Sequence, residues 1–142
     1  MSDESTYPWP RAIVLDDTAA LALGGGNRMV SRFVVEAEKD PTLHVYIPVM
    51  CLAVAERERA GVAEHVGSLP SVDITEMGFD AAAAMGKRVR IEAGRAGADD
   101  WGGAHALHLG LPSVEWPRGR PILTREPGRY RGTGVRAVRI EG

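Results

Sequence analysis

Hydrophobic runs alternate with amphipathic segments along the chain. The apolar run in residues 11–16 predicts a short buried β-strand, and the apolar-rich segments 43–47, 71–75, 121–124 and 135–140 are predicted to be further strands. Between these runs, apolar residues recur at helical spacing and predict helices over about 18–24, 27–38, 49–60, 79–93 and 100–108, with a shorter one at 62–66. This alternation predicts an α/β fold, a three-layer α/β/α sandwich with a mainly parallel central sheet.

The length and composition favour one soluble domain. A chain of 142 residues supports one sizeable core, which we place at about residues 11–141 behind an N-terminal tail at 1–10. Cys51 is the only cysteine, so no internal disulfide can form, as is usual in a reducing cytoplasm. The tail has no apolar signal core, and no apolar run is long enough to span a membrane. We therefore expect a cytoplasmic protein.

The formal net charge of −2 hides an asymmetry. Residues 118–142 hold seven arginines against two glutamates, a net +5, so the rest of the chain carries −7. A basic end on an acidic domain can bind phosphate-bearing partners, although solvated arginines near a C-terminus are also common. The charge pattern alone therefore leaves nucleic-acid binding open.

Three acids stand at the ends of predicted elements. Asp16 ends the first strand, Asp100 starts the last helix and Glu126 follows the fourth strand. In a parallel α/β sheet, ligands bind beyond the carboxyl ends of the strands, so these acids are expected to converge there. Three carboxylates about 4 Å apart repel by roughly 4 kcal/mol per pair in a partly buried site, which favours a bound cation. Mg²⁺ and Mn²⁺ prefer such oxygen ligands, and they support phosphodiester hydrolysis.

The amino-acid sequences of four segments add to the evidence for a metal-dependent nuclease. Residues 13–21 (IVLDDTAAL), 46–56 (YIPVMCLAVAE), 100–106 (DWGGAHA) and 121–127 (PILTREP) resemble, in order and spacing, the PIN-domain family, including toxin ribonucleases of the VapC type. The resemblance covers about residues 11–141. It implies a three-layer α/β/α domain, Mg²⁺- or Mn²⁺-dependent cleavage of RNA, a homodimer and inhibition by an antitoxin protein.

The resemblance also implies roles for individual residues. Asp16 would be the first metal-binding acid and Asp100 the third, with Asp99 as its alternate. Glu126 stands where the family commonly has Asp, two residues after Thr124, which matches the usual Ser or Thr.

The second acid of the family is missing from its expected place. Counting six residues on from Pro48 gives Val54, and the nearest acid is Glu56. Two residues on a helix are about 200° of rotation, so Glu56 would face away unless the register shifts. Either Glu56 assists as a metal ligand, or the chain lacks one.

Further residues complete the predicted site. Thr18 and Thr124 are expected to hydrogen-bond water or ligand, and Asp17 either supports the metal ligands or caps a helix. The residues proposed to contact the RNA backbone are Arg125, Arg129 and Arg131. His105 and His108 share a helical face, where packing and solvation are more common than a metal pair, and Trp101 either stacks on a base or packs in the core.

The leading hypothesis is thus a metal-dependent, toxin-like endoribonuclease with a PIN-like fold. Val54 keeps a second interpretation open, in which the same fold is a catalytically degenerate module that binds RNA or protein. A small nucleotide-binding α/β protein is a third alternative.

Overall fold

The computed structural model describes residues 10–96 and 99–142, and the side chains of 92–96 lie outside that description. The N-terminal tail expected at 1–10 therefore falls outside it except for Pro10. Helices and strands alternate as the hydrophobic pattern predicts, and the described residues add a short 3-10 helix between the last two strands.

Five parallel strands form one sheet. They are β1 (Ala12–Leu15), β2 (His44–Pro48), β3 (Val72–Thr75), β4 (Ile122–Thr124) and β5 (Ala137–Arg139), in the order β3-β2-β1-β4-β5. Every pairing is parallel, which confirms the predicted sheet. Leu15 of β1 pairs with Leu123 of β4, so the residues that follow, Asp16 and Thr124, emerge side by side at the carboxyl edge of the sheet.

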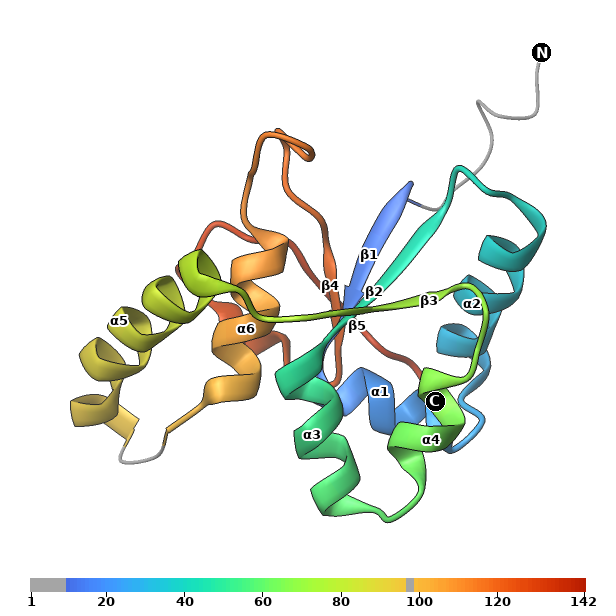
Figure 1. Cartoon of the computed structure of the whole chain (residues 1–142), viewed down its shortest axis with the longest axis horizontal. Helices are drawn as coiled ribbons and strands as arrows, with labels where there is room; N and C mark the ends of the chain where they lie inside the picture. Colours follow the sequence, from blue (N-terminus) through green and yellow to red (C-terminus); the bar gives the residue numbers. More distant parts are fainter. Residues whose placement is uncertain (1–9, 97–98) are drawn as a thin grey trace.

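Helices cover the sheet on both sides. They are α1 (Asp17–Gly24), α2 (Arg28–Lys39), α3 (Val49–Glu58), α4 (Val62–Gly67), α5 (Phe79–Ala96) and α6 (Trp101–Gly110), together with the 3-10 helix η2 (Pro127–Tyr130). Figure 1 shows α5 and α6 on one side of the strands and α2 on the other, while α1, α3 and α4 gather near the carboxyl ends of β1 and β2. The three-layer α/β/α architecture is confirmed, and among the described residues no helix is long and apolar enough to cross a bilayer.

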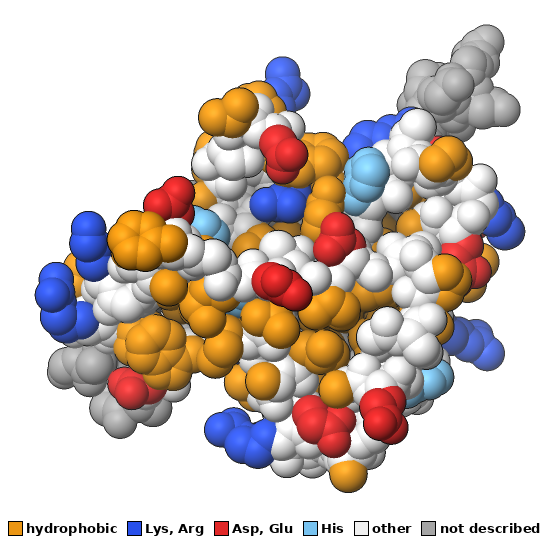
Figure 2. Space-filling view, viewed as in Figure 1, with side chains coloured by type: hydrophobic (Ala, Val, Ile, Leu, Met, Phe, Trp, Pro, Cys, Tyr) orange, Lys and Arg blue, Asp and Glu red, His pale blue; other side chains and the backbone are white. Residues whose placement is uncertain are grey.

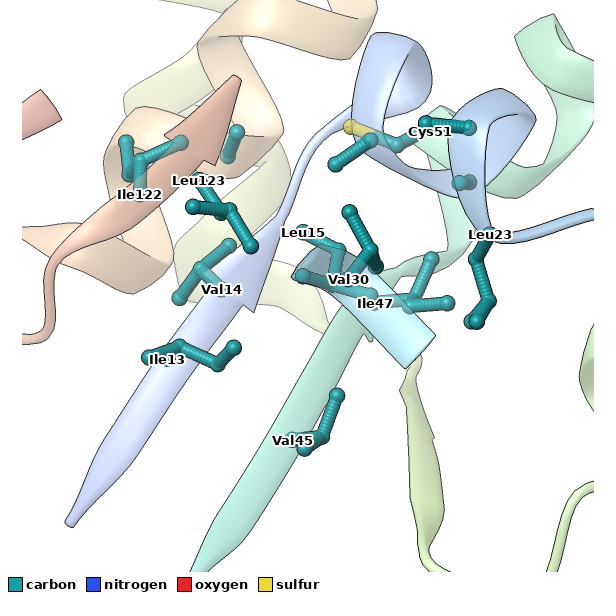
Figure 3. Packing of buried hydrophobic residues seen from close by; sticks show 14 of the residues in the cluster. Ile13, Val14, Leu15, Leu23, Val30, Val45, Ile47, Cys51, Ile122 and Leu123 are labelled. Carbon is teal, nitrogen blue, oxygen red and sulfur yellow. The ribbon is translucent and has the colours of Figure 1, made fainter. Parts of the chain in front are cut away.

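The core lies between the sheet and the helices that cover it. All four residues of β1 are buried, as a central strand covered on both faces requires. Figure 3 shows residues of β1, β2 and β4 packed with Leu23, Val30 and Cys51 from the helices. The Cys51 side chain is fully buried, and burial raises the pKa of its thiol, so it behaves as a small apolar residue.

A smaller apolar cluster joins α5 to α6. Ala81, Met85 and Val89 of α5 pack against Ala104 of α6, with Met50 of α3 beside them. The spacing of four residues along α5 places its three members on one helical face. This contact fixes α5 beside α6 and thereby shapes the cleft described below.

Candidate active site

Three aspartates meet at the carboxyl edge of the sheet. Asp16 follows β1 and caps the start of α1, because its Oδ1 accepts the Ala19 N–H at 3.1 Å. Asp17 is the first residue of α1. Asp100 caps α6 in the same way, accepting the Gly103 N–H at 2.9 Å. The local sequence thus places each carboxylate at a helix N-terminus, where backbone N–H groups and the helix dipole favour negative charge.

Asp16 is fully buried and has a complete set of partners. The Thr18 hydroxyl donates to its Oδ1 at 2.6 Å, and the Tyr130 hydroxyl donates to its Oδ2 at 2.7 Å. Nη1 of Arg129 also donates to Oδ2, at 3.1 Å. Burial, and next the charge of Asp16, raise the pKa of Tyr130, so the phenol keeps its proton and remains a donor. A buried carboxylate with this many donors is held in a single orientation.

Arg129 lies between the three carboxylates. Its Nε and Nη2 donate to Oδ2 and Oδ1 of Asp100 at 2.9 and 2.7 Å, a two-pronged contact that suits the planar guanidinium. Its Nη1 donates to Asp17 at 2.6 Å as well as to Asp16. Burial acts to lower the pKa of Arg129, but the hydrogen bonds to Asp100 and the surrounding negative charges outweigh it, and the pKa is raised. Arg129 therefore carries a fixed positive charge inside the acid cluster formed by Asp16, Asp17 and Asp100.

The pKa values of the two less buried acids, Asp17 and Asp100, are shifted in opposite directions. Burial is the largest influence on the pKa of Asp17, and with the neighbouring Asp16 it outweighs Arg129 and raises that pKa. Burial also acts to raise the pKa of Asp100, but the hydrogen bonds from Arg129 and the Gly103 N–H outweigh it and lower the pKa. Asp17 is therefore the more readily protonated of the two carboxyls.

Two glycines at the start of α6 make room for this arrangement. A Cβ at Gly103 would collide with the Asp100 carboxylate and would lie 2.7 Å from Nε of Arg129. A Cβ at Gly102 would lie 3.3 Å from Oδ1 of Asp17 and 3.6 Å from Nη2 of Arg129. The side chains of the acid cluster and Arg129 thus approach the α6 backbone closely, which side chains at these two positions would oppose.

Thr18 and Thr124 connect the acid cluster to the end of β4. Their hydroxyl oxygens lie 3.3 Å apart, and Thr124 is fully buried. The Thr18 oxygen accepts the Arg125 N–H and the Thr124 oxygen accepts the Glu126 N–H, each at 2.9 Å. The structure places both threonines next to Asp16, where the sequence placed them. Their observed partners are protein groups, and their proposed contacts to water or ligand stay predictions.

Other sequence-predicted acids lie outside the acid cluster. Glu126 and Asp99 are exposed, and neither carboxylate takes part in the hydrogen bonds described above. Glu56 is engaged elsewhere, because its carboxylate accepts the Gly61 and Ala63 N–H groups at 3.0 and 2.8 Å at the start of α4. The structure thus removes Glu56 from the proposed ligand set, and the reason is the helical register and this competing role.

Val54 of α3, and not Glu56, lies next to the acid cluster. Its Cγ2 lies 3.6 Å from the Cβ position of Gly102, next to Asp17. Without a local shift in register, α3 directs an apolar side chain toward the acid cluster. The alternative raised by the sequence, that the chain lacks this ligand, is the one that the structure supports.

Sequence reasoning placed Arg129 on an RNA-contacting surface and overlooked Tyr130. The Arg129 side chain is only 14% exposed, and its donors are directed to the acids. Arg125 and Arg131 are exposed, as a phosphate contact requires. The high density of arginine in residues 118–142 suggested that one arginine would contact the acids, but it did not indicate which one. Nothing in the sequence marked Tyr130 except that it is an aromatic residue close to these arginines in the chain.

The acid cluster as arranged does not fit a metal ion. Its carboxylate oxygens are the ligand type that Mg²⁺ and Mn²⁺ prefer. Within residues 10–96 and 99–142, however, no group of three or more His, Cys, Asp and Glu side chains is arranged so that it could hold an ion. Arg129 separates the carboxylates that would have to approach one another. His105 also stands apart, since it is fully buried and its Nδ1 accepts the Met50 N–H at 3.3 Å.

A basic cleft of about 570 Å³ runs beside the acid cluster, between α5, α6 and the segment after η2. Its cationic lining comes from Lys87 and Arg88 of α5 and from Arg131, with His108 of α6 beside them. Ala104, the residue after Gly103, also lines it, so the cleft and the acid cluster are neighbours along α6. Figure 2 shows Lys and Arg side chains at the α5 end of the molecule, and others spread over the rest of this face.

Solved structures share this fold. A chain of the DNA-bound VapBC from Salmonella typhimurium aligns with a TM-score of 0.60 and 17% identity, over 93% of this chain and 100% of that chain. A chain of VapBC2 from Rickettsia felis, bound to a DNA fragment from its promoter, aligns with a TM-score of 0.60 and 12% identity, over 92% and 99%. No family model and no curated protein matches the sequence. The fold is thus the PIN-like, VapC-like fold that the motifs predicted, and at these identities the likeness establishes the fold alone.

Proposed function

We propose that this chain is a toxin-like PIN-fold endoribonuclease that depends on Mg²⁺ or Mn²⁺ and hydrolyses RNA phosphodiester bonds. The observation that carries the proposal is the convergence of Asp16, Asp17 and Asp100 at the carboxyl edge of a parallel sheet, where folds of this kind bind their ligands. Three carboxylates gathered from two elements far apart in sequence are costly for stability, which is typical of a functional site.

The surroundings of the acid cluster favour RNA as the substrate. The cleft with Lys87, Arg88 and Arg131 offers positive charge for a phosphate backbone that continues past Asp100. Trp101, the first residue of α6, is 39% exposed and can stack on an unpaired base. A cationic cleft, together with an accessible aromatic residue at the start of α6, suits a single strand better than a duplex, whose bases are already stacked.

The proposal extends to partners and location. The two solved structures are VapBC complexes with DNA, which supports an antitoxin protein as a partner of this chain as well. We place the complex in the cytoplasm. A homodimer is part of the same proposal and rests on the family resemblance.

The test is Mn²⁺-dependent cleavage of single-stranded RNA by the wild type and by Asp16→Asn. Asparagine caps a helix as well as aspartate, so the variant keeps the start of α1 while it removes the buried charge. We expect cleavage by Asp16→Asn to fall to the level of RNA without enzyme. Asp80→Asn, an exposed first-turn aspartate of α5, is the matched control that retains cleavage. Equal cleavage by wild type and Asp16→Asn would refute the assignment.

Val54 and Arg129 favour a second candidate, a PIN-fold module that binds RNA or protein without hydrolysis. An apolar residue borders the acid cluster, and an arginine already neutralises part of its charge. This candidate predicts that wild type binds a labelled single-stranded RNA or a partner protein with no cleavage at millimolar Mn²⁺. Cleavage that is lost in Asp16→Asn separates the two.

A further inference from the structure

The guanidinium of Arg129 uses every one of its nitrogens on the acid cluster. Nε and Nη2 hold both oxygens of Asp100, and Nη1 bridges Asp16 and Asp17. The arrangement places one positive charge at the point from which all three acids can be reached.

The side chain of Arg129 also lies close to the α6 backbone. The absence of a side chain at Gly103 lets Nε of Arg129 and the Asp100 carboxylate approach the helix, as the clash of an added Cβ shows. Tyr130, the next residue, is anchored by its own hydrogen bond to Asp16. Arg129 is therefore held between a fixed neighbour in η2 and a backbone surface shaped to receive it.

A divalent ion and this guanidinium cannot share the acid cluster. Mg²⁺ binds oxygen ligands at about 2.0–2.1 Å, which requires the acids to converge on one point. The guanidinium occupies that point, keeps the carboxylates apart and repels a second cation. Among the described residues, no alternative group of three metal-binding side chains is formed.

We propose that Arg129 is the resident cation of the acid cluster, an internal occupant that a divalent ion must displace. The inference rests on the proposed function, in which the acids bind Mg²⁺ or Mn²⁺. Removal of Arg129 leaves an uncompensated group of carboxylates, so it creates a stronger ion-binding site while it destabilises the ion-free protein. In the structure, Arg129 is hydrogen-bonded to all three acids.

The experiment measures Mn²⁺ binding directly, by loss of the free-ion electron paramagnetic resonance signal on titration with protein. We expect Arg129→Gln to bind Mn²⁺ at least about tenfold more tightly than wild type, with Arg129→Lys in between, because lysine keeps the charge but loses the fork. Arg118→Gln, an exposed arginine in the loop after α6, is the matched control and should bind as wild type does. Asp16→Asn in the Arg129→Gln background should abolish the gain.

Thermal unfolding supplies a second readout. We expect Mn²⁺ to raise the Tm of Arg129→Gln and to leave that of wild type nearly unchanged, because only an ion that binds the folded state stabilises it. If Arg129→Gln fails to fold without an ion, Arg129→Lys carries both measurements. Equal affinity in wild type and both Arg129 variants would overturn the proposal, and so would the absence of binding in all of them.

The outcomes separate this inference from the nuclease proposal. Tight Mn²⁺ binding by wild type, with RNA cleavage that Asp16→Asn abolishes, would leave the nuclease and remove the role of Arg129. A gain of Mn²⁺ binding in Arg129→Gln, with no cleavage by either protein, would leave Arg129 as the resident cation and remove the nuclease.

Discussion

The acid cluster and the basic cleft adjoin the same helix, but they differ in how far their charges are neutralised within the protein. At the start of α6, the acids are compensated internally by Arg129 at hydrogen-bonding distance. Along the middle of α6, the described side chains that line the cleft include Lys87 and Arg131 and no acid. The charge of the acids is thus partly neutralised within the protein, whereas the cations that line the cleft can attract anions from solution. Under the proposed function, the cleft would bind the RNA strand and the acid cluster would act on it.

The largest effect should come from breaking the acid cluster at α6. Asp100→Asn keeps the helix cap but removes the charge of one proposed metal-binding carboxylate, so we expect RNA cleavage to fall by roughly a hundredfold. The measurement is the initial cleavage rate in Mn²⁺. Asp99→Asn, one residue away and exposed, should cause the smaller loss, and the reverse order would make Asp99 the functional acid.

The sequence was informative about this region wherever an element ends. The apolar run before Asp16 and the helical spacing after Asp100 fix both acids at the carboxyl edge, because parallel strands align their ends there. For Glu56 the sequence left two alternatives open, a metal ligand after a shift in register or a residue that faces away, and in the structure its carboxylate accepts backbone N–H groups at the start of α4.

The sequence was uninformative about Arg129, because no periodicity describes the segment between β4 and β5. The path of η2 brings Arg129 to Asp16, which lies 113 residues earlier in the chain. Seven arginines in 118–142 are equivalent on charge alone. Which of them enters the acid cluster depends on the backbone direction after Thr124 and on the space left by Gly103, and both are tertiary features.

The next effect should come from reversing the charge of the cleft. Lys87→Glu with Arg131→Glu removes two cations and adds two anions along the proposed RNA path. We expect weaker binding of a cleavage-resistant single-stranded RNA, and a plot of log affinity against log salt that is shallower by about 1.4, about 0.7 for each phosphate that the protein no longer neutralises. The measurement is fluorescence anisotropy at several salt concentrations.

The matched control for the cleft is Arg118→Glu with Arg139→Glu. It makes the same change in net charge at two exposed arginines outside the cleft lining. If the two double variants lose affinity and salt dependence equally, the effect comes from overall charge, and the cleft is not the RNA path.

The smallest effect concerns a third face of α6, where His105 is fully buried against α3. Its Nδ1 accepts the Met50 N–H, its Nε2 has no hydrogen-bond partner among the described residues, and burial, with a minor contribution from His108, lowers its pKa to about 4. In the unfolded chain the pKa returns to about 6.5. The unfolded state therefore binds more protons between these values, and stability falls as the pH decreases from about 6.5 to about 4, by up to about 3 kcal/mol.

The measurement for His105 is the free energy of unfolding in urea between pH 7.5 and pH 4.5. His105→Asn offers an oxygen to the Met50 N–H but does not titrate, so this variant should lose less stability on acidification than wild type, whatever its stability at pH 7.5. His65→Asn, at an exposed position of α4, should keep the wild-type pH dependence. An identical pH dependence in wild type and His105→Asn would show that acidification acts through other groups, with the carboxyls of the acid cluster first among them, because Asp17 and Asp100 have shifted pKa values of their own.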